Sequence, residues 1–275
     1  MSNSGQSKWL AASDLRRLRE NRGSGHGSEY VPWLKIHEIS SKGQKHQLKG
    51  VTTGRTHHLL SSLEAAYFRL FDWRTNVVDI REQYPMLPIE ATLDIANDLG
   101  IKHPNMTKVK GKYHVLTADF VLTSTLCGVN YKTIALSCKY DQSLVSNATI
   151  ARQEIEKIYF DKYAIDQQVA SWAIITESSI PIKLLHNLQL LTPDIFHLLS
   201  RNDIERVKHF LVNQKSQHVG ALRLAELCAE HIKLDQRVAL NCLRYLIYYG
   251  FFDIDLKEKF NFYSPLIIAK KGEYL

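Results

Sequence analysis

Three charged residues stand where a metal-dependent nuclease needs them. Glu64 falls in an amphipathic segment that predicts a helix, and Asp119 and Lys139 each interrupt an apolar, strand-like segment, over residues 114–122 and 133–140. A charge within an apolar strand is costly to bury unless it binds a metal, finds a partner or opens onto a cleft. One helix and two strands that each carry such a residue therefore predict a single catalytic site.

The chemistry that these residues could perform is phosphodiester hydrolysis with Mg²⁺, for which Mn²⁺ is expected to substitute. A bound cation polarises the phosphate and lowers the pKa of an attacking water. Mg²⁺ prefers a few carboxylates, with the remaining positions filled by water, phosphate or carbonyl oxygen. Glu64 and Asp119 supply the carboxylates, and the backbone carbonyl of Cys138 is a further candidate ligand. The Lys139 ammonium is expected to steady the attacking water or the developing phosphorane charge.

Each of these residues also has a simpler interpretation, as a solvated charge on a strand edge or a helix surface. The order Glu, Asp, Lys occurs by chance in many chains, so spacing alone supports the catalytic and the structural interpretation about equally. Glu156, in an expected helix over residues 147–168, is either a surface charge or an accessory carboxylate that positions water or metal. His57 and His58 are open to roles as metal ligands, phosphate contacts or ordinary residues at the edge of the core.

Composition limits the class of protein. The 275 residues are 45% hydrophobic and 23% charged, as in soluble globular proteins, and suffice for one large or two modest domains. No apolar run approaches the roughly 18 residues of a membrane helix, and the first residues lack an apolar signal core. We therefore expect a cytoplasmic protein without membrane contacts. Its four cysteines show no C-x-x-C spacing, which argues against a structural zinc site and a disulfide framework.

Positive charge is concentrated at the start of the chain. Residues 1–60 hold ten Lys and Arg against four Asp and Glu, whereas the remainder is nearly balanced. Residues 1–50 are therefore expected to form a basic arm that contacts DNA, with a solvated tail as an equally supported alternative. The candidate DNA-binding residues are Arg16, Arg17, Arg19, Arg22, Arg55, His57 and His58. A lysine-rich loop, with Lys102, Lys108, Lys110 and Lys112, has no assigned role.

The order of expected elements predicts a mixed α/β core followed by a helical region. In the core we expect a short basic helix at 8–20, the Glu64 helix to about residue 73, a strand at 77–84, a helix at 93–99, strands at 114–122 and 133–140, a helix at 147–168 and a strand at 171–176. After Pro181 we expect helices at 184–191, 193–201, 203–213, 219–231 and 235–249. Residues 251–256 and 259–263 then alternate around Lys257-Glu258, which predicts a hairpin. Helices followed by a hairpin are typical of a winged helix.

Several motifs around these residues resemble the TnsA family of transposition endonucleases. They are the glycine-rich Arg22–Gly27, Tyr30–Trp33, Gly54–Glu64 and Asp79–Pro85. The resemblance extends from about residue 14 to residue 180 and is weaker beyond. It implies a restriction-endonuclease-like N-terminal domain, here residues 1–181, and a winged-helix-like C-terminal domain, residues 182–275, that binds partners or DNA. Glu64 and Asp119 then correspond to the family's metal-binding acids and Lys139 to its catalytic lysine.

The resemblance further implies a place in a bacterial transposition complex, in the cytoplasm and associated with the nucleoid during transposition. The family makes Mg²⁺-dependent cuts in the 5′ strands at transposon ends, while a DDE transposase, TnsB, cuts and joins the 3′ strands. An AAA+ regulator, TnsC, contacts the C-terminal region.

One residue departs from the family pattern. Ser137 stands where the family often has Gln or Glu, so it would reach a metal only through water, and binding of a second metal is left open. The rival functions are a stand-alone restriction or repair nuclease of the same fold, and a non-catalytic DNA-binding adaptor in which Ser137 marks a decayed site.

Overall fold

The computed structural model describes residues 8–39, 44–126, 130–163, 169–213 and 219–269. The chain divides into two compact units. The first comprises Met1–Leu48, Arg55–Phe68 and Asn76–Ile180, and the second Lys49–Gly54, Arg69–Thr75 and Pro181–Leu275. Because each unit combines early and late segments, the domain boundaries expected from the sequence stay a prediction. Among the described residues, no helix is both long enough and apolar enough to cross a membrane.

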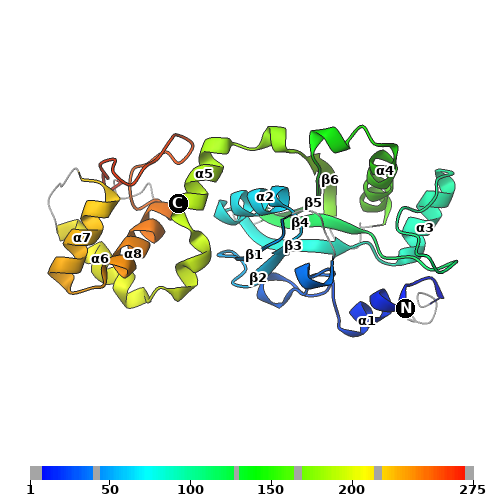
Figure 1. Cartoon of the computed structure of the whole chain (residues 1–275), viewed down its shortest axis with the longest axis horizontal. Helices are drawn as coiled ribbons and strands as arrows, with labels where there is room; N and C mark the ends of the chain where they lie inside the picture. Colours follow the sequence, from blue (N-terminus) through cyan, green and yellow to red (C-terminus); the bar gives the residue numbers. More distant parts are fainter. Residues whose placement is uncertain (1–7, 40–43, 127–129, 164–168, 214–218, 270–275) are drawn as a thin grey trace. The chain divides into compact units, whose positions relative to one another are not determined.

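A four-stranded mixed sheet forms the centre of the first unit (Figure 1). Its strands, in spatial order, are β3 (Val77–Pro85), β4 (Thr117–Leu126), β5 (Asn130–Cys138) and β6 (Val169–Ile175). The first two pairs are antiparallel and β5–β6 is parallel. A parallel pair needs a crossover, which helix α4 (Asn147–Lys162) supplies. The expected α/β fold with helices on a mixed sheet is confirmed.

Helices pack against this sheet. In Figure 1, α3 (Ile89–Asp98) and α4 lie side by side, and Ile95, Ile155 and Tyr159 pack in one core with residues of β4 and β5. The helix expected at 93–99 thus begins earlier than predicted. The long expected helix ends at Lys162, and residues 164–168 lie outside the described part of the chain.

Smaller elements complete the chain up to residue 180. These are α1 (Ala12–Arg19), the two-stranded sheet of β1 (His46–Lys49) and β2 (Thr56–Leu59), α2 (Ser62–Trp73), and the 3-10 helices η2 (Gly27–Glu29), η3 (Ile36–Glu38), η4 (Asp141–Ser143) and η6 (Glu177–Ser179). Helix α2 carries Glu64 in its first turn, as expected.

The late part of the second unit is helical, in agreement with the sequence. It contains α5 (Ile182–Leu191), the 3-10 helix η7 (Pro193–Leu198), α6 (Arg201–Asn213), α7 (Ala221–Ile232) and α8 (Gln236–Tyr248). The predicted N-cap of α8 is present, because the Asp235 side chain accepts hydrogen bonds from the backbone N–H groups of Arg237 (2.9 Å) and Val238 (3.1 Å).

The prediction of a hairpin between Phe251 and Tyr263 is wrong, because these described residues contain no paired strands. Phe252 instead forms an isolated antiparallel bridge with Ile268. Phe251 and Phe252 are both buried, so the segment does not follow the in–out alternation of a half-buried strand. The aromatic side chains at its start therefore belong to the core of this unit.

Candidate active site

Glu64 is held rigidly at the first turn of α2. Its Oε1 accepts a hydrogen bond from the Ser61 hydroxyl (2.8 Å), and its backbone N–H donates to Ser61 Oγ (3.1 Å). This reciprocal pairing resembles a capping box, which explains why Ser61 begins the helix three residues before an acid. Glu64 Oε2 accepts from the backbone of Leu60 (2.9 Å) and from Gln83 Nε2 (3.0 Å). The carboxylate is buried and fixed on both oxygens.

Asp119 and Lys139 meet where β4 and β5 lie side by side. Asp119 Oδ2 accepts hydrogen bonds from the Lys139 ammonium (2.8 Å) and from the backbone N–H of Cys138 (2.7 Å). The same ammonium donates to the Cys138 carbonyl (2.9 Å). The antiparallel register, in which Phe120 faces Leu136, produces this meeting of residues twenty positions apart.

A cleft of about 460 Å³ opens beside these groups. Its lining includes Asp119, Lys139 and Gln83, and Gln83 connects it to Glu64 through their hydrogen bond. The other lining residues are Leu34, Leu60, Pro104, Asn105, Thr117, Ala148, Thr149 and Arg152. Two of the three predicted catalytic residues, Asp119 and Lys139, thus line the cleft, and the third, Glu64, is bonded to the lining residue Gln83 and is near enough to Asp119 to feel its charge.

The pKa values of Glu64 and Lys139 are both raised in the cleft. Burial, and then the nearby Asp119 carboxylate, raise the pKa of Glu64 to about 8. Burial opposes the charge of Lys139, but Asp119 and Glu156 outweigh it and raise the pKa of the ammonium above its ordinary value. Lys139 offsets only part of the rise in the pKa of Glu64, and a further positive charge beside Glu64 would lower that pKa.

The donor set fits a hard divalent cation. The described residues contain no cluster of three or more His, Cys, Asp or Glu side chains that could hold a metal. A cation here would therefore take Glu64, Asp119 and the Cys138 carbonyl, with water or phosphate oxygens in the remaining positions. Mg²⁺ commonly binds in that way.

Ser137 and Glu156 are paired with each other. Both are completely buried, and the Ser137 hydroxyl donates a hydrogen bond to Glu156 Oε2. Glu156 Oε1 accepts from Arg152 Nε (3.0 Å), and Arg152, which lines the cleft, also donates to the Thr117 carbonyl (3.2 Å). The indirect metal role expected for Ser137 and Glu156 stays a prediction, and Arg152 is their link to the cleft.

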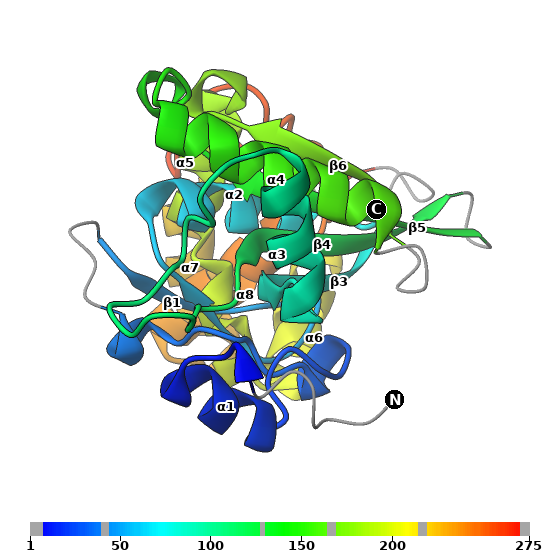
Figure 2. The same cartoon turned by 90° about the vertical axis from the view of Figure 1, so that its right-hand side faces the viewer.

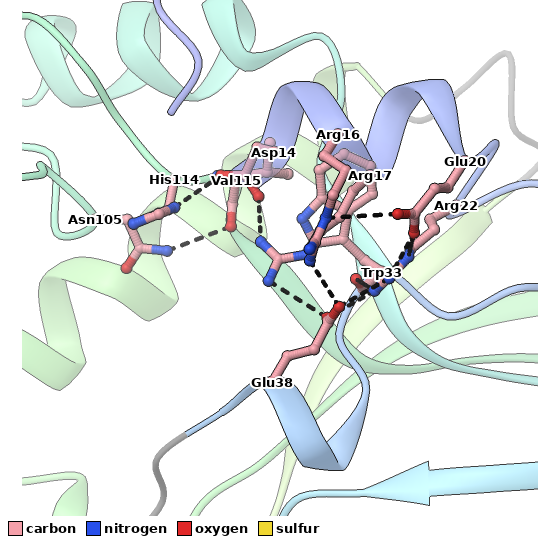
Figure 3. A network of polar contacts seen from close by, with 10 residues as sticks. All are labelled: Asp14, Arg16, Arg17, Glu20, Arg22, Trp33, Glu38, Asn105, His114 and Val115. Atoms are coloured by element: carbon pink, nitrogen blue, oxygen red, sulfur yellow. Dashed lines mark hydrogen bonds and ion pairs between the residues drawn. The ribbon is translucent and has the colours of Figure 1, made fainter. Parts of the chain in front are cut away.

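Two arginines expected to bind DNA are instead buried near the N-terminus (Figure 3). Arg22 donates to both carboxylate oxygens of Glu38 (2.7 and 2.8 Å) and to the Trp33 carbonyl (3.2 Å). Arg17 forms an ion pair of 2.6 Å with the buried Asp14. Burying a guanidinium is costly unless it is paired, and here both are paired within the protein.

Arg55 and His57 are likewise buried, around Glu82. Arg55 donates to both carboxylate oxygens of Glu82 (2.8 and 2.5 Å), and His57 Nδ1 lies 2.8 Å from Glu82 Oε2. Burial alone would raise the pKa of Glu82, but His57 and Arg55 reverse the effect and lower it well below its ordinary value.

The DNA-contact expectation is therefore revised for Arg17, Arg22, Arg55 and His57. The three arginines pair with buried or half-buried carboxylates inside the fold. His57 lies against Glu82 and has no exposed surface. The remaining candidates differ. Arg16 and Arg19 are exposed, although Arg16 bonds to Glu38 (2.9 Å). His58 is half-buried, and burial lowers its pKa.

Sequence reasoning missed Gln83 as a residue of the site. Its backbone is left-handed (φ 49°), which is uncommon for a residue other than glycine, and its side chain is buried between Glu64 and Thr117. Thr117 Oγ1 donates to its amide oxygen (3.3 Å). The sequence shows only a polar residue in an alternating strand, and no pattern there signals the unusual backbone.

Comparison with known proteins gives similarity to transposition endonucleases. Residues 74–177 match the family model described as "TnsA-like endonuclease N terminal", a range that contains Asp119 and Lys139 but not Glu64. The chain is 37% identical over 176 residues to the transposon Tn7 transposition protein TnsA of Escherichia coli. That similarity covers 64% of this chain and 60% of the relative, so the chain spans less than two thirds of the relative's length.

Proposed function

We propose that the chain belongs to the TnsA-type family and is the DNA-cutting subunit of a heteromeric transposase, because residues 74–177 match the TnsA-like endonuclease model and the chain is similar to a transposition protein. In this proposal it hydrolyses the 5′ strands at transposon ends in a Mg²⁺-dependent reaction. A TnsB-like DDE transposase cuts and joins the 3′ strands, and a TnsC-like AAA+ regulator contacts the C-terminal region. The relative's description as a transposition protein supports this assignment.

One observation carries the proposal. A carboxylate from β4 and the ammonium that follows β5 line one cleft, and a buried carboxylate from α2 is bonded to Gln83 in its wall, in a region similar to endonucleases. A buried acid of raised pKa is typical of a functional site.

Each residue of the cleft has a part in the proposed reaction. Mg²⁺, held by Glu64, Asp119 and the Cys138 carbonyl, would polarise the scissile phosphate and lower the pKa of the attacking water. The Lys139 ammonium, already oriented by Asp119, stabilises the negative charge that develops on phosphate oxygens. Gln83 keeps the Glu64 carboxylate from rotating, and Arg152 adds a second cation to the cleft wall.

The test is strand-specific cleavage of a plasmid that carries both transposon ends, with the partner transposase and regulator present. Wild-type chain should cut the 5′ strands in Mg²⁺ and not in EDTA, and Glu64→Gln should not cut. Glu154→Gln is a matched control, because Glu154 is an exposed carboxylate of α4. Cleavage by Glu64→Gln at the wild-type rate would overturn the assignment. Cutting by the chain without partners would favour a stand-alone nuclease, and DNA binding without cleavage under any condition would favour an adaptor.

A further inference from the structure

The lysine-rich segment forms a loop between α3 and β4 (Figure 2), and backbone contacts hold it in place. Met106 and Tyr113 form an antiparallel bridge, and the backbone N–H of Thr107 donates to the Lys112 carbonyl (2.9 Å), which closes a short turn. Tyr113 also bridges to Leu10, at the start of the described chain. The segment is therefore a folded hairpin-like turn attached to the N-terminal residues.

Helix α1 fixes the far end of this segment through Asp14 (Figure 3). Asp14 is completely buried, and its Oδ2 accepts from the backbone N–H of Val115 (3.2 Å) and lies 2.9 Å from His114 Nδ1. Its Oδ1 accepts from Arg17 (2.6 Å), and Arg17 in turn lies 3.5 Å from Glu38. The arginine once expected to bind DNA thus helps to hold the lysine-rich segment.

This segment borders the catalytic cleft. Pro104 and Asn105 line the cleft, and Asn105 Nδ2 donates to the Val115 carbonyl (3.3 Å). Lys102 stands two residues before Pro104 and Lys108 three residues after Asn105. An extended chain spans at most about 3.6 Å per residue, so the Cα atoms of Lys102 and Lys108 lie within roughly 7–11 Å of the cleft wall. Lys110, five residues after Asn105, lies within roughly 18 Å by the same bound, and the side chains add further reach.

The charge of the segment suits a polyanion. Residues 102–112 contain four lysines and no Asp or Glu. Lys102, Lys108 and Lys110 are exposed, whereas Lys112 donates to the Lys8 carbonyl (2.9 Å). Duplex DNA carries one negative charge per about 1.7 Å of its axis, so a duplex seated at the cleft brings phosphates along its rim.

We propose that Lys102, Lys108 and Lys110 form a contact surface for the DNA backbone at the rim of the cleft, positioned by α1. The inference rests on the proposed function in that it takes DNA as the substrate of the cleft. It adds lysines outside the basic arm to the expected cationic contact, and the buried Arg17 helps to position their segment through Asp14.

The experiment measures affinity of the full chain for a duplex of arbitrary sequence against salt concentration, without divalent metal. The test variant is Lys102→Ala/Lys108→Ala/Lys110→Ala. The matched control is Lys132→Ala/Lys157→Ala/Lys162→Ala, which removes the same charge at exposed lysines outside the cleft lining. Each lost phosphate contact should reduce the slope of log K against log salt by about 0.9, so three contacts reduce it by about 2.7.

A reduced slope in the test variant with an unchanged slope in the control supports the proposal. Equal slopes for the wild type and the test variant, equal losses in the two variants, or no duplex binding by the wild type at low salt would overturn it. The proposed nuclease function has a separate readout. Because binding is measured without metal, failure of cleavage in Mg²⁺ with an intact lysine effect would count against the nuclease function alone.

Discussion

The cleft and the arginine cluster of the N-terminal segment are both built from acids and cations, but their charges are balanced differently. In the cluster, Glu38 is bonded to Arg22, which lowers the pKa of Glu38 to about 2. In the cleft, burial and the Asp119 carboxylate raise the pKa of Glu64 to about 8, and Lys139 offsets only part of this rise. A carboxylate that is fully paired holds a fold together. A buried carboxylate whose pKa is raised, such as Glu64, is a candidate for binding a further cation.

This difference explains why positive charge misled the sequence-based assignment of DNA contacts. Arg17 and Arg22 raise the charge of the N-terminal segment, yet Asp14 and Glu38 neutralise them inside the fold. Sequence shows how many cations and acids a segment has, whereas the exposure of each cation depends on which acids pair with it in the fold, here Asp14 three residues from Arg17 and Glu38 sixteen residues from Arg22. The exposed lysines of residues 102–112 have no acidic neighbour within their own segment.

The largest effect is expected in the cleft, from Asp119→Asn. Loss of a carboxylate that would hold Mg²⁺ should slow 5′-strand cleavage on the order of a thousandfold or more. Folding should change little, because the variant loses the ion pair with Lys139 but also loses the repulsion with Glu64, and asparagine can still accept from the Cys138 N–H. The measurement pairs cleavage rates with thermal melting. Wild-type cleavage by a well-folded variant would show that the cleft is not the active site.

The opposite outcome is expected in the arginine cluster, from Glu38→Gln. Paired Glu38 has a pKa of about 2 against an ordinary 4.5, which corresponds to about 3 kcal/mol of folding stability. Since the folded-state pKa is lowered, this contribution is complete above pH 4.5 and is lost as pH falls towards 2. Urea unfolding at pH 7 and pH 3 measures it. The variant should be less stable at pH 7 and approach the wild type at pH 3, with cleavage per folded molecule unchanged. An equal deficit at both pH values would contradict the ion-pair origin.

Much of this fold could be predicted from the sequence, because local patterns determine it. Strand β3 lies where its alternating residues predicted a strand and ends at a proline, although all of its residues except Val78 are buried. Helix α8 has its Asp235 cap, and Glu64 follows Ser61 at capping-box spacing. The convergence of Asp119 and Lys139 was also accessible, since two adjacent strands with one misfit charge each favour a shared site.

The unpredicted features depend on tertiary contacts. The left-handed backbone of Gln83 is stabilised by neighbours that no local pattern reveals. The Phe251–Tyr263 segment alternates like a hairpin, but burial of both Phe251 and Phe252 overrides that pattern. The pairing of Ser137 with Glu156 joins positions that only the packing of α4 brings together.

The stability difference between Glu64→Gln and the wild type should change with pH in the opposite direction to that of Glu38→Gln. The folded-state pKa of Glu64 is raised, so its contribution to stability is complete below pH 4.5 and is lost as pH rises through about 8. Without metal, the free energy of unfolding of the variant should therefore increase relative to that of the wild type between pH 5 and pH 8, by on the order of a few kcal/mol. Saturating Mg²⁺ should stabilise the wild type, by about 2.7 kcal/mol at 100 times its Kd, and leave the variant little changed. If the stability difference between variant and wild type does not change with pH, Glu64 does not have the raised pKa.

The smallest effect, and the one that separates positioning from ligation, is expected from Gln83→Met. Methionine keeps the length of the side chain but cannot donate to Glu64, whose Oε2 would retain only the Leu60 N–H. Loss of a group that orients a metal ligand typically costs tenfold or somewhat more in metal affinity or activity. We therefore expect about a tenfold slower cleavage at limiting Mg²⁺ that higher Mg²⁺ partly restores, with unchanged DNA affinity. Thr117→Val is the matched control, because it removes the hydrogen bond to the amide oxygen and leaves the Gln83–Glu64 bond in place. It should slow cleavage less than Gln83→Met. If both variants lose activity equally and Mg²⁺ rescues neither, Gln83 supports the packing of the cleft and does not orient Glu64.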